Sequence, residues 1–452
     1  MQKLTNGSHT NWRHIWRLAW PMIISNVTVP LVGAVDVAMM GHLNNPAFIG
    51  GVGLGMMLFN AIYFGMGFLR MGTTGLVAQS QEHDAATQTA RILVRGLALA
   101  FSIGLTVILA APVITKTAAA LFSASQLVES LMVDYATIRL LAAPAALGNM
   151  VLLGVLYGRQ QMFGGMMLLL IINLINLILD FVFVLGLGMT ATGVAIASVC
   201  AQWCGFLYMI WFINRPQSKL GVGNFLQKKL ILLALRDRAA YRRFFILSWD
   251  IFIRTALLVL CEVVVLNQAA KLGDLDLATC QLVLTLFGIV AFALDAFAHA
   301  AEALVGEAIG KRKPKDLRIV IWRSNTLAAG LALIIAFILW IGDSIILRLF
   351  TNQNALIEHA QYHWLWACLL APASFLAFQL DGIFIGATRA RDMRNAMIIS
   401  TCGLGGALLI LDPWGLHGLL AAFIGFLGLR GASLWWHINR VYAQAIPPMQ
   451  QR

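Results

Sequence analysis

Charged side chains are scarce in this sequence: lysine, arginine, aspartate and glutamate make up only 12% of its 452 residues. In an average soluble domain about 25% of the residues are charged and about 45–50% are apolar. Here 60% of the residues are hydrophobic, and the mean hydropathy is +0.80. This balance excludes an ordinary soluble protein and predicts an all-α polytopic membrane protein.

Cysteine is also sparse, and the six cysteines form neither a CxxC pair nor another spacing typical of a metal site. The glycine-rich run over residues 50–55 follows no strand and lacks the Gly-Lys-Ser/Thr ending of a nucleotide-binding loop. Nucleophile-elbow and metalloprotease motifs are missing, and no cleavable signal peptide is visible. We therefore expect no enzyme activity, no catalytic residue and no cofactor, and we interpret the cysteines as small core residues.

Long apolar runs dominate the sequence instead, and we predict that twelve of them form transmembrane helices. Each run reaches or approaches the roughly 20 residues that an α-helix needs to cross a bilayer. The predicted spans lie at 14–40, 48–79, 92–115, 130–156, 163–187, 191–213, 243–272, 278–309, 317–342, 361–386, 392–411 and 415–440.

Basic residues are distributed unevenly between the predicted loops, and this predicts the orientation. The loops that follow even-numbered spans contain most of the lysines and arginines, whereas the alternate loops hold only Lys116, Lys271 and Arg348. Because basic residues gather on the cytoplasmic side, both termini are predicted to lie in the cytoplasm, with the chain in the inner (cytoplasmic) membrane. The asymmetry also accounts for the net charge of +12, so we expect no nucleic-acid partner.

The two halves of the sequence resemble each other. The pair Leu58-Phe59 recurs as Leu286-Phe287, and the Ala-Pro-Ala triplet at 143–145 recurs at 371–373, both with an offset of 228 residues. Each half has an even number of spans, so the repeat is parallel and its pseudo-twofold axis follows the membrane normal. Repeats of this kind are typical of secondary transporters. We predict two six-helix lobes, 1–213 and 243–452, joined by a basic linker, 214–242.

The first predicted span contains residues that are unusual for a membrane helix. Pro21 and Pro30 each remove a backbone hydrogen bond, so we expect hinges there. Asp36 places a carboxylate at membrane depth, which is costly unless it faces water, a partner or an ion. We predict that it binds the coupling ion, the alternative being a buried, satisfied aspartate. The same helix supplies the residues predicted to line an apolar substrate cavity, which are Asn26, Met39 and Met40. The alternative for the methionines is ordinary packing in the membrane core.

Further polar groups in the first half could join Asp36. Asn176 and Asp180 are four residues apart and therefore share one helix face, and Ser198 adds a hydroxyl on the next span. Two carboxylates, an amide and a hydroxyl could share a proton or coordinate Na⁺. The alternatives are interhelical hydrogen bonding for Asn176 and simple close packing for Ser198.

The second half has its own intramembrane acids, which are secondary candidates for an ion site. Asp295 and Asp381 replace Gly67 and Leu153 of the first half, so the repeated fold does not require them. Glu262 is a third candidate. Two arginines within apolar runs, Arg70 and Arg254, are interpreted as structural charges that neutralise acids or bind backbone carbonyls.

Several phrases resemble one known family. VPLVGAVDVAMMGHL, FLRMGTTGLVAQ, NLINLILD, ALDAFAHAAEALVGEAIG and LDGIFIGATRARDMRN are similar to the multidrug and toxic compound extrusion (MATE) transporters, and more narrowly to their DinF branch. The resemblance covers nearly the whole chain. It implies a V-shaped pair of lobes around a central cavity, with Asp36 as the first-helix acid that takes the proton. Asn176, Asp180 and Ser198 match the polar cluster of the first lobe, although relatives often have threonine at the Ser198 position. Many DinF relatives have no acid at the position of Glu262.

The resemblance implies export of organic, often cationic or amphipathic compounds by alternating access, driven by influx of protons. Sodium coupling, with Na⁺ at Asp36, Asn176 and Asp180, is the alternative for the ion. A flippase for a lipid-linked or amphipathic substrate is the alternative for the activity, whereas a channel or membrane enzyme fits the sequence less well. The expected partners are small organic substrates and the lipid bilayer, and we expect a monomer.

Overall fold

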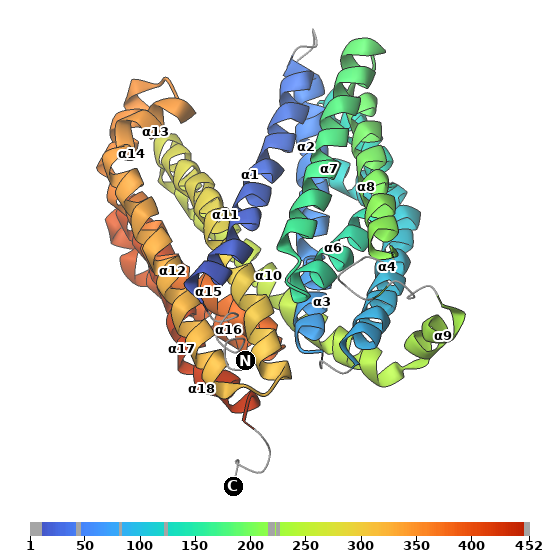
Figure 1. Ribbon diagram of the computed structural model, residues 1–452. Coiled ribbons are helices and arrows are strands. Elements are labelled where there is room, and N and C mark those ends of the chain that lie inside the picture. Colours follow the sequence, from blue (N-terminus) through green and yellow to red (C-terminus); the bar gives the residue numbers. More distant parts are fainter. Residues whose placement is uncertain are drawn as a thin grey trace. The chain divides into compact units, whose positions relative to one another are not determined.

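In the computed structural model of the chain, the described residues are 11–41, 47–80, 84–121, 125–215, 222 and 227–446, without the side chains of 27, 29–41, 47, 49 and 121. The regular elements within these ranges are all helices (Figure 1). They form two compact units, described separately below. The N-unit is Ile24–Phe245, and the C-unit comprises the residues up to Ile23 together with Ile246–Arg452.

The N-unit contains the second part of α1 (Trp12–Gly41) and the elements up to the first turns of α10 (Arg238–Leu272). Both α1 and α10 therefore belong to both units. The elements between them are α2 (Ala47–Gly65), α3 (Phe68–Ala78), α4 (Ala85–Leu121), α5 (Gln126–Leu140), α6 (Ala143–Gly158), α7 (Met162–Asp180), the π-helical η2 (Phe181–Gly186), α8 (Ala191–Ile213) and α9 (Lys228–Arg236).

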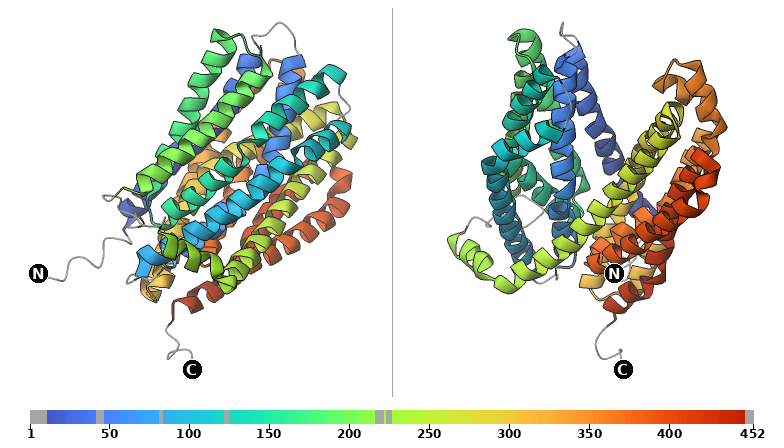
Figure 2. Two further views of the ribbon diagram at one scale, coloured as in Figure 1. Left: turned by 90° about the vertical axis from the view of Figure 1, so that its right-hand side faces the viewer. Right: turned by 180° about the vertical axis from the view of Figure 1, so that it is seen from behind.

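The C-unit begins with the first turns of α1 and continues after Phe245 with most of α10. Its remaining elements are α11 (Asp274–Gly310), α12 (Pro314–Ile341), α13 (Asp343–Phe350), α14 (Asn354–Tyr362), α15 (Trp364–Gly386), α16 (Ala390–Leu411), the 3-10 turn η3 (Asp412–Trp414), α17 (Gly415–Trp436) and α18 (Ile438–Gln444). Two further views show the course of these helices (Figure 2).

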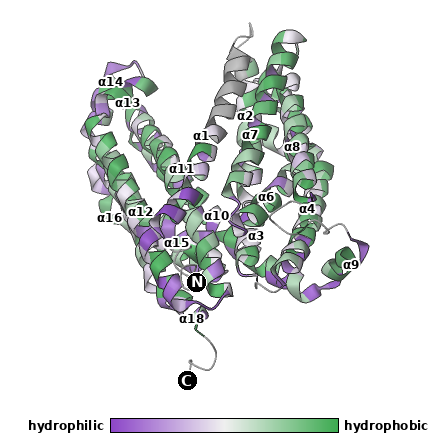
Figure 3. Ribbon diagram, viewed as in Figure 1, coloured by the Kyte–Doolittle hydropathy of each residue, from purple (hydrophilic) through white to green (hydrophobic). Residues whose placement is uncertain are grey.

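Each of the twelve predicted spans coincides with a helix or with a pair of consecutive helices. By length and apolar composition, nine spans within the described residues could cross a membrane, or ten if the bent pair α5–α6 is one span. That pair bends by 53° because Pro144 lies in the first turn of α6, where it cannot continue the preceding helix. Apolar residues make up most of the long helices, and hydrophilic residues gather on short helices such as α9 and α18 (Figure 3).

The internal repeat recurs in the packing of each unit. In the N-unit, a Cβ atom on Gly154 or Gly158 of α6 would lie 2.7–2.8 Å from a backbone oxygen of α3, that of Arg70 or of Thr74. In the C-unit, a Cβ atom on the corresponding glycines of α15 would collide with the backbone of α11 in the same way. The glycines permit this close helix approach because they lack a side chain. The pairs that correspond, each offset by 228 residues, are Gly154/Gly382, Gly158/Gly386, Arg70/Ala298 and Thr74/Glu302.

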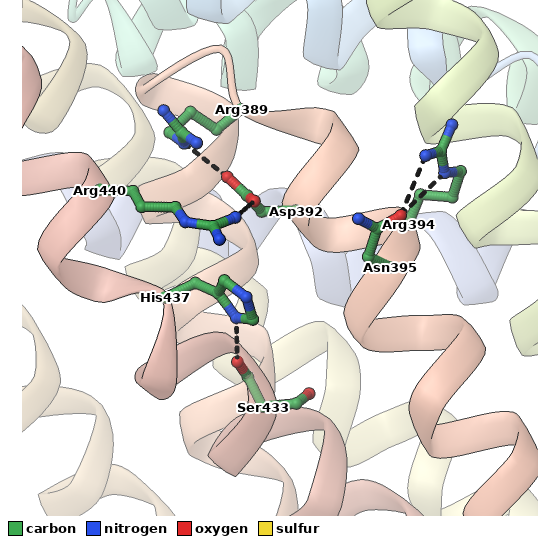
Figure 4. Close-up of polar contacts among 7 residues, drawn as sticks. All are labelled: Arg389, Asp392, Arg394, Asn395, Ser433, His437 and Arg440. Atoms are coloured by element: carbon green, nitrogen blue, oxygen red, sulfur yellow. Dashed lines mark hydrogen bonds and ion pairs between the residues drawn. The ribbon is translucent and has the colours of Figure 1, made fainter.

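A network of charges fixes the corner between α15 and α16 (Figure 4). Asp392, buried in the first turn of α16, accepts hydrogen bonds from Arg389 at 2.5 Å and from Arg440 of α18 at 2.6 Å. Arg394 donates to Asp250 of α10 at 2.6 Å and to its neighbour Asn395. Asp392 therefore joins the start of α16 to α18, and Arg394 joins α16 to α10.

Candidate functional site in the N-unit

The first candidate site is built on the buried face of α7. Ile172, Asn176 and Asp180 are each buried and each one turn apart, so they form one stripe along this helix. Gly205 of α8 makes room for the stripe, since a Cβ atom there would lie 2.4 Å from Ile172. The close approach of α8 seals the polar groups of α7 inside the unit.

Ser198 of α8 connects these groups to a residue that the sequence reasoning missed. Its hydroxyl oxygen accepts a hydrogen bond from Asn176 Nδ2 at 3.3 Å and another from Arg139 Nη1 at 2.8 Å. Arg139 Nη1 also lies 2.6 Å from the Tyr135 hydroxyl oxygen, to which it donates. The cluster formed by Tyr135, Arg139, Asn176, Asp180 and Ser198, which we call the N-unit polar cluster, therefore contains a fixed positive charge.

The glycine-rich run of α2 positions Arg139. A Cβ atom on Gly51 would lie 2.6 Å from Leu131, and one on Gly55 would lie 2.4 Å from the Tyr135 ring. One turn further along the same register, the guanidinium carbon of Arg139 lies 4.4 Å from the centre of the Phe59 ring. This cation–π contact replaces part of the hydration that the charge loses in the membrane. An arginine inside the predicted span 130–156 was the signal that could have identified this residue.

The first helix contacts this region through Thr28, whose hydroxyl accepts a hydrogen bond from Asn173 of α7 at 3.0 Å. Pro21 is buried and Asn26 is half-buried. The side chains of Pro30, Asp36, Met39 and Met40 lie outside the described residues. The boundary between the two units falls between Ile23 and Ile24, so α1 passes from the C-unit to the N-unit between the two prolines that were predicted as hinges.

The acids of the second half that were predicted as candidates for an ion site lie around Arg430, a second arginine that was not predicted from the sequence. Asp381 of α15 is buried, and its Oδ2 accepts hydrogen bonds from Arg254 of α10 and from Arg430 of α17. The Arg430 side chain is only 1% exposed, and it also interacts electrostatically with Asp295 and Glu262. Buried charges of this kind persist only when they are paired, so this C-unit ion cluster ties three helices together.

Comparison with known proteins relates both halves of the chain to one protein family. The profile of the MatE family matches residues 21–182 and 251–414, which fall in the two halves of the repeat. The DNA damage-inducible protein F of Escherichia coli K12 is 36% identical over 422 residues, covering 93% of this chain and 90% of that protein. The multidrug resistance protein MdtK of Yersinia pseudotuberculosis is 24% identical, covering 93% of each chain.

Solved structures agree with the family profile at the level of the fold. A crystal structure of MATE in the bent conformation superimposes with a TM-score of 0.82 at 18% identity, covering 95% of each chain. A multidrug resistance MATE family transporter in the outward-facing conformation superimposes with a TM-score of 0.81 at 19% identity, covering 95% of this chain and 96% of that one. The helical arrangement predicted from the internal repeat is therefore the MATE fold.

Proposed function

This chain belongs to the MatE family of secondary transporters, and we propose that it exports organic, often cationic or amphipathic compounds in exchange for protons. The observation that carries the proposal is the N-unit polar cluster. It places a carboxylate, an amide, a hydroxyl and a guanidinium together in the middle of apolar helices. Buried polar groups of this kind are costly in a membrane protein and are therefore typical of ion or substrate pathways.

The hydrogen bond between Thr28 and Asn173 supports Asp36 as the second carboxylate of this site. From that contact, Asp36 is eight residues further along α1 and Asp180 is seven residues further along α7. At 1.5 Å per residue, these steps correspond to about 12 Å and about 10 Å along the two helices. The first and fifth predicted spans run in the same direction, so this register supports a common depth for the backbones of Asp36 and Asp180.

The charges then provide a coupling mechanism. Arg139 balances one of the two carboxylates, which leaves the cluster with one negative charge in excess. A proton or a cationic substrate can each neutralise that excess, but both together would leave a net positive charge in a medium of low dielectric. At an effective dielectric of about 20, two like charges about 8 Å apart repel by about 2 kcal/mol. Proton and substrate therefore exclude each other, which is the requirement for exchange.

Helix α1 is the element proposed to convert this exchange into movement. It belongs to both units, and Pro21 and Pro30 lie on either side of the boundary between them. Because a proline leaves a carbonyl without its helical hydrogen bond, α1 can bend there at low cost. Protonation of Asp36 would remove its charge, and a bend at Pro30 would reshape the substrate surface predicted at Asn26, Met39 and Met40.

The test measures transport of a fluorescent organic cation into proteoliposomes under imposed ion gradients. A pH gradient should drive uptake of a fluorescent organic cation by the wild type, and a sodium gradient of equal size should not. Asp36→Asn should insert and fold normally but lose proton-driven transport, and Asp180→Asn should impair it. Asp274→Asn, at an exposed carboxylate of α11, is the matched control and should transport like the wild type.

Other outcomes would point to the alternatives. If a sodium gradient alone drives transport, the coupling ion is Na⁺. If labelled lipid crosses the bilayer while the dye does not, the protein is a flippase. If Asp36→Asn still accumulates the dye at the wild-type rate, the coupling site lies elsewhere, and Asp295 and Asp381 become the next candidates. We propose that the protein lies in a bacterial inner membrane with both termini in the cytoplasm. This orientation sets the direction of each gradient.

A further inference from the structure

The basic segment between the two halves contains a short amphipathic helix, α9, that the transport mechanism does not use. Its sequence is KKLILLALR. Ala234 is fully buried, which identifies the face that packs against the rest of the N-unit. On the opposite face, Lys228, Lys229 and Arg236 fall within one sector of about 100°. Leu232 lies within this basic sector, and Leu233 and Leu235 lie on either side of it; these leucines are 49%, 52% and 43% exposed.

Arg95 of α4 fixes this helix in place. Its Nε donates to the carbonyl oxygen of Ala234 at 3.1 Å, and its Nη2 forms an ion pair with Asp237 at 3.0 Å. Asp237 also caps α10, since its Oδ1 accepts a hydrogen bond from the backbone amide of Ala240 at 3.0 Å. These hydrogen bonds and this ion pair therefore fix the corner between α9 and α10. Helix α9 lies beside the first turns of α4 (Figure 1).

The depth of α9 follows from the helix that comes after it. The predicted span of α10 begins at residue 243, seven residues after Arg236, which corresponds to about 10 Å of helix. The headgroup layer on each side of a bilayer is about 5–8 Å thick, so the end of α9 lies near the outer boundary of this layer. The excess of basic residues predicts that this end of the chain faces the cytoplasm, where anionic lipids give the membrane surface a negative potential.

Within the part of the chain that the structure describes, no ion pair neutralises the charge of this surface. The basic residues exposed on α9 and on the first turns of α10 form no ion pair with any residue that the structure describes. The only acid between them, Asp237, is already bound to Arg95. This basic surface consists of Lys228, Lys229, Arg236, Arg238, Arg242 and Arg243.

We propose that α9 is an interfacial helix that binds anionic phospholipid headgroups through Lys228, Lys229 and Arg236 while its exposed leucines face the headgroup layer on the side of the acyl chains. Basic and leucine side chains side by side on a short amphipathic helix match this environment, because lysine and arginine can extend from the apolar boundary to the phosphates. The lipid stabilises the link through which the N-unit continues into α10. The proposal does not depend on the identity of the substrate or of the coupling ion.

The experiment uses the full-length protein in nanodiscs of phosphatidylcholine, with or without phosphatidylglycerol, and measures amide hydrogen exchange of residues 228–236. Phosphatidylglycerol should slow exchange in this segment several-fold for the wild type. In Lys228→Gln/Lys229→Gln/Arg236→Gln the effect should disappear. Each neutralised charge should also lower the preference for phosphatidylglycerol by about fivefold, as expected for about 1 kcal/mol per basic residue at a membrane surface.

The matched control removes the same number of positive charges from the opposite set of loops. Lys116→Gln/Lys271→Gln/Arg348→Gln changes exposed basic residues that lie outside this surface, and it should retain the wild-type response to phosphatidylglycerol. Exchange that is indifferent to phosphatidylglycerol in the wild type, or an equal loss in both triple variants, would overturn the proposal. Protection of α9 by an acidic polypeptide but not by phosphatidylglycerol would also overturn it, since the surface would then bind an acidic protein.

Discussion

The Arg139 guanidinium donates a 2.8 Å hydrogen bond to the Ser198 hydroxyl, and this contact joins α5 to α8 inside the N-unit. The same hydroxyl accepts a bond from Asn176 of α7. The positive charge of Arg139 therefore cannot move away from Ser198 and the Asn176 amide without breaking this network. In the mechanism proposed above, this fixed cation makes charge balance, rather than a single acid, the basis for exchange.

Replacing Arg139 tests that idea. In the wild type, lowering the pH by one unit should weaken binding of an organic cation by up to about tenfold, because one proton competes with one substrate. Arg139→Gln removes the balancing charge, so proton and cation can bind together and the pH dependence should become much weaker. Arg139→Lys keeps the charge and should preserve it. Dye binding to nanodisc-embedded protein over a pH series measures the slope, and an unchanged slope in Arg139→Gln would contradict the mechanism.

Pro30→Ala should slow turnover while leaving the ion-binding charges intact. Alanine restores the helical hydrogen bond and stiffens α1 around residue 30, by up to about 3 kcal/mol in helix propensity. Substrate binding should change little, but the exchange rate in proteoliposomes should fall. Pro112→Ala is the control, because Pro112 is an exposed proline inside α4 of the N-unit. Equal effects of both substitutions would mean that the result reflects general helix stability.

The C-unit ion cluster predicts an asymmetry between two substitutions. Asp381→Leu introduces the residue found at the corresponding position of the N-unit, yet it leaves both Arg254 and Arg430 without their shared acceptor. Removing one partner of a buried ion pair typically costs about 3–5 kcal/mol. Arg430→Met leaves Asp381 paired with Arg254 and should cost less. Thermal unfolding in detergent should rank the wild type first, Arg430→Met second and Asp381→Leu last, and two variants as stable as the wild type would show that the cluster does not stabilise the unit.

Gly386→Ala should disturb the packing of α15 against α11. The added Cβ atom would lie 2.3 Å from the carbonyl oxygen of Glu302, so the helices must separate. Overpacking of this kind costs about 1–3 kcal/mol, and it should lower both the yield of folded protein and its melting temperature. At Gly425 of α17, no atom lies within 4 Å of an added Cβ, so Gly425→Ala should behave like the wild type. Unaltered stability in Gly386→Ala would show that the close contact can relax.

The positions of the spans could be predicted from the sequence because apolar length and the distribution of basic residues are properties of the chain itself. The breaks within them were harder to predict. The bend at α5–α6 depends on how the first turn around Pro144 packs, and no apolar run is interrupted there. The predicted linker 214–242 also contains α9, which is too short for a membrane span and acquires its structure from Arg95 of α4.

By itself, the sequence determined the class of protein, its internal repeat and its candidate acids, since hydropathy, a constant offset and unusual charges need no knowledge of contacts. Only the tertiary structure decided which charges meet. Asp381 lies 127 residues from Arg254 and 49 from Arg430, and Arg139 lies 59 from Ser198. Such pairs form because helices distant in the chain pack side by side, and a charge buried by that packing is stable only where a partner from another helix reaches it.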